Sequence, residues 1–266
     1  MELVDICFNL TSDAFREDEA QVVKRARQAG VRYFVITGSN IKDSDHALRL
    51  CAQYENAYAT AGIHPHMASE YSERSLVALQ DLAAHEKVVA IGETGLDYNR
   101  NYSSPAEQRI AFEAQLELAA DLALPVFLHQ RDAHADFTRI LSRFRDRLGK
   151  AVTHCFTGNA DELECYIDLD CHIGITGWIC DERRGQHLHE LVQHIPAERL
   201  MIETDAPYLL PRNLPADTNF PKPRGRRNEP AYLPHILRTV ADCRLVSQEQ
   251  TARETTRTAK DFFAIG

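Results

Sequence analysis

The sequence predicts one α/β domain folded as a (β/α)8 barrel, the TIM-barrel architecture, and three observations support this prediction. Short apolar runs alternate with longer amphipathic stretches along the whole chain, which is the pattern of parallel strands joined by helices. Eight such units fit within 266 residues, close to the ~250 residues typical of this barrel. The competing doubly wound sheet usually carries a glycine-rich phosphate loop after its first strand, and none follows Leu10.

The predicted strands are short, mostly apolar and rich in β-branched residues. Runs of this length and composition are typical of strands that are buried on both faces, as the strands of a parallel barrel are. We expect the eight strands over residues 3–10, 33–38, 57–64, 88–93, 124–129, 151–154, 172–175 and 200–205.

Helices are predicted between these strands, in charged segments with apolar residues at helical spacing. The clearest start is at Ser104, because Pro105 takes the first helical position and Glu107 completes a capping box. Two more helices are expected between residues 230 and 266, and no linker interrupts the chain, so residues 1–266 are predicted to form a single domain with these last helices packed on the barrel. The other predicted helices cover residues 17–29, 41–54, 73–86, 134–147, 159–168 and 183–195.

Composition limits the location and the partners of the protein. Seven cysteines without a Cys-x-x-Cys pair predict free thiols in a reducing compartment. No apolar run approaches the roughly 20 residues that span a bilayer, and the first residues lack the basic segment of a signal peptide. We therefore expect a cytoplasmic monomer that does not contact membranes. The net charge of −9 argues against non-specific coating of nucleic acid, but it allows an enzyme that binds a few phosphates locally.

Four predicted strands end in residues that bind metals. Glu93 ends a buried run, where a carboxylate is unfavourable unless a cation or strong hydrogen-bond donors receive it. Three other strands end in His129, His154 and Asp205. Because parallel barrel strands all end on one face, we expect the four side chains to converge there. Carboxylate and imidazole together suit zinc, manganese or another divalent ion, although a single histidine at a strand end is more typical of a structural hydrogen bond.

Two further groups are candidates for binding a substrate phosphate. His64 and His66 follow the third strand on the same face, where they could bind a metal, donate hydrogen bonds to an anion or serve in packing. A basic loop that contains Arg226 and Arg227 follows the eighth strand. In an acidic protein such a loop suggests phosphate binding, although most runs of charge are simply solvated.

These residues lie in motifs that resemble the TatD family of metal-dependent hydrolases over nearly the whole chain. The resemblance implies a TIM barrel, hydrolysis of phosphodiester bonds in DNA with a divalent metal, metal binding by Glu93, His129 and His154, and Asp205 as a ligand or proton acceptor. The motifs are Gly62-Ile63-His64-Pro65-His66, Gly92-Glu93-Thr94-Gly95-Leu96-Asp97-Tyr98, Leu128-His129, Thr153-His154-Cys155-Phe156-Thr157-Gly158, Glu203-Thr204-Asp205-Ala206-Pro207-Tyr208-Leu209 and Arg227-Asn228-Glu229-Pro230.

The first strand departs from the pattern of the family. Members typically open with Asp-x-His-x-His, whereas this chain has Cys7 and Asn9 after Asp5. Cys7 is a soft ligand that suits zinc and disfavours magnesium, and Asn9 offers only a neutral oxygen. This opening resembles the bacterial subgroup of the family that acts as a 3′-to-5′ exonuclease on single-stranded DNA and RNA, with DNA repair or nucleic-acid turnover as the expected role.

In the expected mechanism, the metal ligands and the phosphate-binding residues act together at the carboxyl-terminal face of the barrel. A divalent ion, expected to be Mg²⁺ with Zn²⁺ or Mn²⁺ as alternatives, would polarise a phosphoryl oxygen. Glu93 and Asp205 are the expected catalytic residues, with Asp205 accepting a proton. His64, His66, Arg226 and Arg227 are expected to bind phosphate. Tyr98, Phe156 and Tyr208 could stack a base, but packing is the favoured role for each.

Two alternative functions remain open. The same scaffold supports ester or amide hydrolysis, for example removal of an aminoacyl group from tRNA, because fold alone does not decide the bond that is cleaved. A nucleic-acid-binding protein with a structural metal is the alternative from another class. The four candidate ligands and the basic loop favour an enzyme over that alternative.

Overall fold

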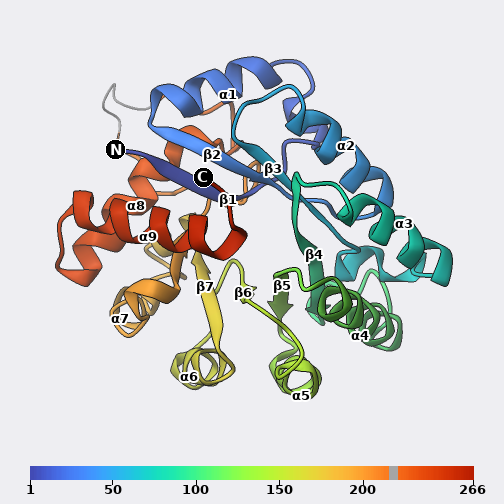
Figure 1. Ribbon diagram of the computed structural model, residues 1–266. Helices are drawn as coiled ribbons and strands as arrows, with labels where there is room; N and C mark the ends of the chain where they lie inside the picture. The colour runs from blue at the N-terminus through green and yellow to red at the C-terminus, as the bar shows by residue number, and fades with distance from the viewer. Residues whose placement is uncertain (216–220) are drawn as a thin grey trace.

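In the computed structural model, which describes residues 1–215 and 221–266, eight parallel strands follow one another round a single sheet in chain order (Figure 1). A parallel bridge between Phe8 and Ala206 brings the end of the sheet back to the first strand, and the predicted TIM barrel is confirmed. The strands are β1 (Leu3–Phe8), β2 (Val31–Ile36), β3 (Ala57–Ala61), β4 (Val88–Asp97), β5 (Val126–Arg131), β6 (Ala151–Thr153), β7 (Cys171–Ile175) and β8 (Leu200–Ile202).

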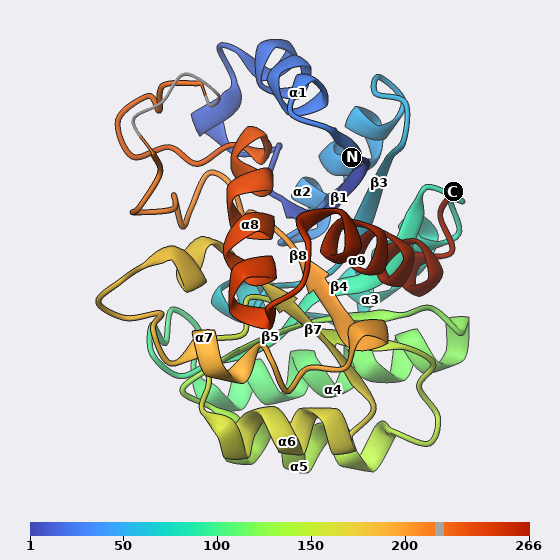
Figure 2. The same cartoon turned by 90° about the vertical axis from the view of Figure 1, so that its left-hand side faces the viewer.

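Helices surround the sheet (Figures 1 and 2). The capping box at Ser104 and Glu107 is present, and the Ser247 side chain accepts a hydrogen bond from the Gln250 N–H at the start of the last helix. The start at Ser104 is the one predicted from the sequence. The helices are α1 (Glu19–Gln28), α2 (Ile41–Cys51), α3 (Glu73–Ala83), α4 (Pro105–Leu122), α5 (His134–Phe144), α6 (Ala160–Asp168), α7 (Leu188–Leu191), α8 (Leu233–Arg244) and α9 (Gln248–Phe263).

The structure corrects the predicted helix over 183–195, of which only the four residues of α7 are α-helical. Asp181 explains most of the difference. Its side chain accepts the Arg183 N–H, and its backbone oxygen accepts the Gly185 N–H at 2.7 Å. These bonds hold the segment in turns, because a side chain that bonds to nearby backbone N–H groups competes with helix formation.

Two of the strand ends that differ from the prediction bear on the site. β4 continues four residues beyond Glu93, to Asp97, because Thr94–Asp97 pairs with Leu128–Arg131 of β5. β8 ends at Ile202, three residues before Asp205, whose φ of 54° is left-handed and incompatible with a strand. The first difference adds a second carboxylate to the end of β4.

The interior of the barrel is apolar below the predicted site. Phe127, Val152 and Met201 precede the polar side chains at the ends of β5, β6 and β8 by two positions, and they belong to one buried cluster with Phe262 and Phe263 of α9. α9 packs against β1 and β8. The burial of this cluster leaves polar side chains only at the carboxyl ends of these strands, which is where barrel enzymes carry their sites.

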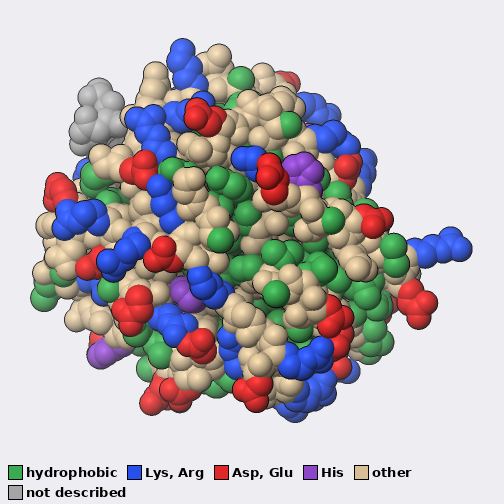
Figure 3. All heavy atoms as spheres, viewed as in Figure 1, with side chains coloured by type: hydrophobic (Ala, Val, Ile, Leu, Met, Phe, Trp, Pro, Cys, Tyr) green, Lys and Arg blue, Asp and Glu red, His purple; other side chains and the backbone are tan. Residues whose placement is uncertain are grey.

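The surface shows no dominance of one charge on the face in Figure 3, where basic and acidic side chains are interspersed. This mixture agrees with the expectation that phosphate binding is local. Among the described residues, no helix combines the length and the apolar character needed to cross a membrane.

Candidate metal centre and active site

Three histidines converge on one oxygen of Glu93. Its Oε1 lies 2.8 Å from His129 Nδ1, 2.7 Å from His154 Nε2 and 3.2 Å from His64 Nε2. Gly92 makes this possible, since its φ is +144° and a side-chain carbon there would lie 2.3 Å from a backbone oxygen of β5. Burial opposes the charge of Glu93, but the charges of His154 and His64 and the hydrogen bonds from the rings hold its pKa well below the ordinary value.

The geometry at Glu93 fits a divalent cation. His129 Nδ1 and His154 Nε2 are 3.3 Å apart, and both face the same carboxylate oxygen. If both nitrogens carried protons, these protons would repel each other at this distance. Two nitrogen lone pairs and a carboxylate oxygen directed at one point instead suit a metal ion. Among the described residues, the ligand atoms of His64, Glu93 and His129 lie within 4.8 Å of one another. The contacts of His129 Nδ1 and His154 Nε2 with Glu93 Oε1 bring together the three predicted ligands Glu93, His129 and His154.

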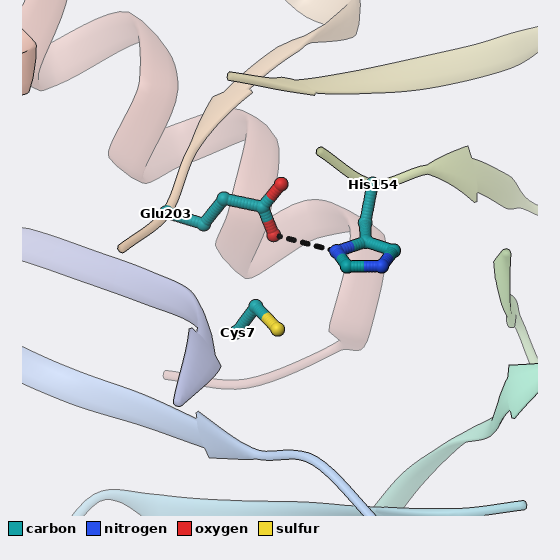
Figure 4. A group of neighbouring side chains, drawn as sticks. All are labelled: Cys7, His154 and Glu203. Carbon is teal, nitrogen blue, oxygen red and sulfur yellow. Dashed lines mark ion pairs between the residues drawn. The ribbon is translucent and has the colours of Figure 1, made fainter. Parts of the chain in front are cut away.

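Two further carboxylates face the outer nitrogens of these rings. Glu203 Oε2 lies 3.5 Å from His154 Nδ1 (Figure 4), and Asp97 Oδ2 lies 3.5 Å from His129 Nε2. Carboxylates in this position fix the tautomer and orientation of a metal-binding histidine. Glu203 is fully buried, and Gly174 leaves room for it, since a side-chain carbon on Gly174 would lie 2.6 Å from Glu203 Oε1.

Sequence reasoning assigned no role to Asp97 or Glu203, although both lie in the quoted motifs. Burial raises the pKa of Asp97, but hydrogen bonds from His129 and His66 outweigh burial and leave the pKa well below its ordinary range. The available signal was the spacing of the acids. Glu203 precedes Asp205 by two positions and Asp97 follows Glu93 by four, so each strand end carries a second acid near the first.

Asp205 lies at the seam between the first and last strands. Its Oδ1 accepts a hydrogen bond from Asn9 Nδ2 at 2.9 Å and a weaker one from the Cys7 thiol at 3.5 Å, while its N–H donates to the Cys7 oxygen. Burial raises the pKa of Asp205 to about 7. The charge of His154 lowers this pKa, and the charge of Glu93 raises it further. The residues matching the absent histidine pair thus contact Asp205.

Cys7 belongs to a second group of possible ligand atoms, with His154 and Glu203, all within 4.8 Å of one another (Figure 4). Burial, followed by the charges of Asp205 and Glu203, raises the pKa of the Cys7 thiol well above its ordinary value. In the described part of the chain, Asp205 is in neither of these two groups. Its role as a metal ligand stays a prediction.

His64 and His66 differ in their surroundings. His64 Nδ1 accepts the His66 N–H at 3.0 Å, so the proton of a neutral His64 ring is on Nε2, which faces Glu93. Burial lowers the pKa of His64 to about 4, and the neutral form is therefore the ground state near pH 7. His66 Nε2 lies 2.7 Å from Asp97 Oδ2. Both rings are at the site, but their binding of phosphate stays a prediction.

Arg226 and Arg227, the two residues of the basic loop that were predicted to bind phosphate, do not share one environment. Arg227 Nη1 is 2.7 Å from Asp18 Oδ1, and Arg227 Nη2 is 2.6 Å from Glu229 Oε1. Hydrogen bonds from Arg227 lower the pKa of Asp18 to about 2 despite partial burial. This guanidinium is committed to two carboxylates. Arg226 is exposed and forms no ion pair within residues 1–215 and 221–266, so of these two arginines only Arg226 remains available to an incoming phosphate.

A parallel barrel whose strand ends carry imidazole and carboxylate ligands, with further carboxylates behind the rings, is the design of a metal-dependent hydrolase. The chain belongs to the TatD family, since the family model described as TatD related DNase matches residues 4–264. The family and the candidate ligand groups support a divalent metal. The resemblance inferred from the motifs is confirmed.

Named relatives and solved structures agree with this assignment. The "3′-5′ ssDNA/RNA exonuclease TatD" of Klebsiella pneumoniae (strain 342) is 51% identical over 263 residues, covering 99% of this chain and 98% of the relative. The protein of the same name from Escherichia coli K12 is 50% identical and covers 99% of both chains. The crystal structure of a TatD homologue from Escherichia coli K12 matches with a TM-score of 0.88 at 28% identity, covering 99% of this chain and 98% of that one.

Proposed function

We propose that this chain is a metal-dependent phosphodiesterase that removes nucleotides from the 3′ end of single-stranded DNA and RNA. The observation that carries the proposal is the convergence of three ring nitrogens on Glu93 Oε1 at 2.7, 2.8 and 3.2 Å. The support for the substrate is about half identity, over nearly the whole chain, to relatives named as 3′-5′ ssDNA/RNA exonucleases.

Glu93, His129 and His154 would hold the divalent ion, with Asp97 and Glu203 orienting the two rings. When bound, the ion supplies a Lewis acid that polarises a phosphoryl oxygen and makes a coordinated water more acidic. Mg²⁺ is the proposed working ion, because it binds substrate phosphates well while the protein supplies only a few ligands.

Residues of the chain would then accept the proton of the attacking water and bind the phosphate. Asp205, with its pKa near 7, is suited to accept the proton of the attacking water. Its Oδ1 is held by Asn9, so this contact fixes the direction of the carboxylate. His64 carries its proton on Nε2 and can donate to a non-bridging phosphate oxygen, and His66 and Arg226 supply further donors for the developing charge.

We also infer that the protein works in the cytoplasm as a monomer, in nucleic-acid turnover or repair. All seven cysteines are free, which supports a reducing compartment. Light scattering after size-exclusion chromatography tests the monomer directly, and a larger mass would contradict it.

Digestion of a 5′-labelled single-stranded oligonucleotide tests the activity. With added Mg²⁺ we expect a ladder that shortens from the 3′ end, and we expect it to disappear with a chelator or with Glu93→Ala. Glu113→Gln is the matched control, since Glu113 pairs with Arg143 on the outer surface of the barrel. An oligonucleotide that stays intact with Mg²⁺, Mn²⁺ and Zn²⁺ would refute the nuclease function, and aminoacyl-tRNA would then be the substrate to try.

A further inference from the structure

Two tyrosines stand out on the surface of the protein. In the described part of the chain, the exposed aromatic side chains are Tyr102 at 68% and Tyr208 at 60%. Burial normally stabilises a large aromatic ring, so an exposed one beside a site suggests a ligand that covers it. Phe156 and Tyr98, which the sequence also suggested for stacking a base, are unsuited to that role. Phe156 is buried, and the Tyr98 hydroxyl donates to Asp136 at 2.8 Å.

Tyr102 is the outermost ring of a row that starts at the metal-binding residues. Ring centroids are 4.6 Å apart between His129 and His64, 4.3 Å between His64 and His66, and 4.8 Å between His66 and Tyr102. All three contacts are edge-to-face, a favoured geometry for aromatic pairs. The row leads from the centre of the site to an exposed ring.

The backbone beside Tyr102 is firmly held. The buried Ser103 hydroxyl donates to the His66 oxygen at 3.1 Å and accepts the Ser69 N–H at 3.0 Å. Gln108 Nε2 donates to the Ser103 oxygen at 2.9 Å. An exposed ring on an anchored backbone loses little conformational entropy when a flat ligand stacks on it.

Tyr208 lies on the loop after β8, next to the seam. Its N–H donates to the Asp205 oxygen at 2.9 Å. In the ring of eight strands, β4 and β8 are four positions apart. The loops that carry Tyr102 and Tyr208 therefore leave the barrel from opposite strands.

We propose that Tyr102 and Tyr208 form two nucleobase-binding walls that hold the unpaired bases at the 3′ end of the strand on either side of the Glu93 centre. This inference rests on the proposed exonuclease function and adds to it a positioning role for two residues. Stacking on an aromatic ring tolerates every base, because each has a π-face. The same walls favour single strands, since the faces of paired bases are already covered in a duplex.

The test uses two 5′-labelled oligonucleotides that differ only at the 3′ end. One carries ordinary nucleotides, and the other has two abasic nucleotides with the same phosphates. For the wild-type protein we expect the abasic substrate to raise KM by about 5-fold to about 150-fold, the range expected for losing a stacked base. In Tyr102→Ala and Tyr208→Ala the difference between the two substrates should shrink, mainly in KM, while Tyr→Phe at either position should keep it.

Val77→Ala serves as the matched control, because Val77 is exposed at 58% on α3 and has no part in the row of rings. If both alanine variants discriminate between the two substrates as the wild type does, the inference is wrong while the exonuclease function stands. If the phenylalanine variants lose the discrimination as fully as the alanine variants, the hydroxyls and not the ring faces act, and stacking is refuted. A wild-type protein that shortens neither oligonucleotide refutes the function and the inference together.

Discussion

The ion pairs around Asp18 give a prediction that can be worked from the structure. Asp18 is 8% exposed and contacts Arg227 through both carboxylate oxygens, at 2.7 and 2.8 Å, and Arg25 at 3.2 Å. Hydrogen bonds from Arg227 and Arg25 lower its pKa from 3.8 to about 2. At about 1.36 kcal/mol per pH unit, this difference corresponds to about 2 kcal/mol of stability at neutral pH. For a chain of this size we expect Asp18→Asn to lower Tm by about 4–8 °C.

The pH dependence of this contribution follows from the direction of the shift. Because the pKa is lower in the folded protein, the stabilisation is present above the unfolded value near 4 and is lost as the pH falls towards about 2. Thermal unfolding of wild type and Asp18→Asn between pH 7 and pH 3 should show a constant difference that shrinks only below about pH 4. Asp13→Asn is the control, since its pair with Arg16 is exposed and should contribute little. Equal Tm values at pH 7, or a difference unaffected by acid, would refute the reasoning.

Three further predictions concern the site. Glu203→Gln should weaken Mn²⁺ or Zn²⁺ binding by about 10-fold to 100-fold, because it removes the carboxylate behind His154, and titration calorimetry that finds unchanged affinity would contradict this role. Gly174→Ala should weaken the same metal binding and reduce the free energy of unfolding, measured in urea, by about 1–3 kcal/mol, because its new carbon would lie 2.6 Å from Glu203 Oε1. Gly149→Ala is the control and should change neither the metal affinity nor the free energy of unfolding, because a side-chain carbon there has no heavy atom within 4 Å. Asp205→Asn should lower kcat by about 100-fold or more with metal affinity largely kept, so wild-type turnover in this variant would remove Asp205 from the mechanism.

Sequence periodicity predicted the barrel because most of the strands are buried on both faces and most of the helices between them show an apolar stripe. The convergence of Glu93, His129 and His154 was also predictable, because strand ends in a parallel barrel share one face. The topology alone places these side chains together, whatever their distance along the chain.

Contacts that depend on the direction of a side chain or on strand pairing could not be predicted from the sequence. Arg227 looked like a phosphate ligand because its neighbours are basic, yet its guanidinium pairs with Asp18, 209 positions away. The extension of β4 to Asp97 depends on pairing with β5, which local composition does not encode. Segment 183–195 has helical composition, but the bonds to Asp181 hold its start in turns.

The seam between the first and last strands has a consequence for folding. Glu93, His129 and His154 belong to neighbouring strands in the middle of the sheet, whereas Asp205 is held in place by bonds to Cys7 and Asn9 across the junction. We expect a barrel that has opened along this junction to keep the proposed metal-binding side chains together, while Asp205, the proposed proton acceptor, loses the contacts that orient it. A newly made or damaged molecule in this open state would then bind the ion without cleaving nucleic acid. During refolding, slow hydrogen exchange at the Asp205 N–H should therefore appear together with activity.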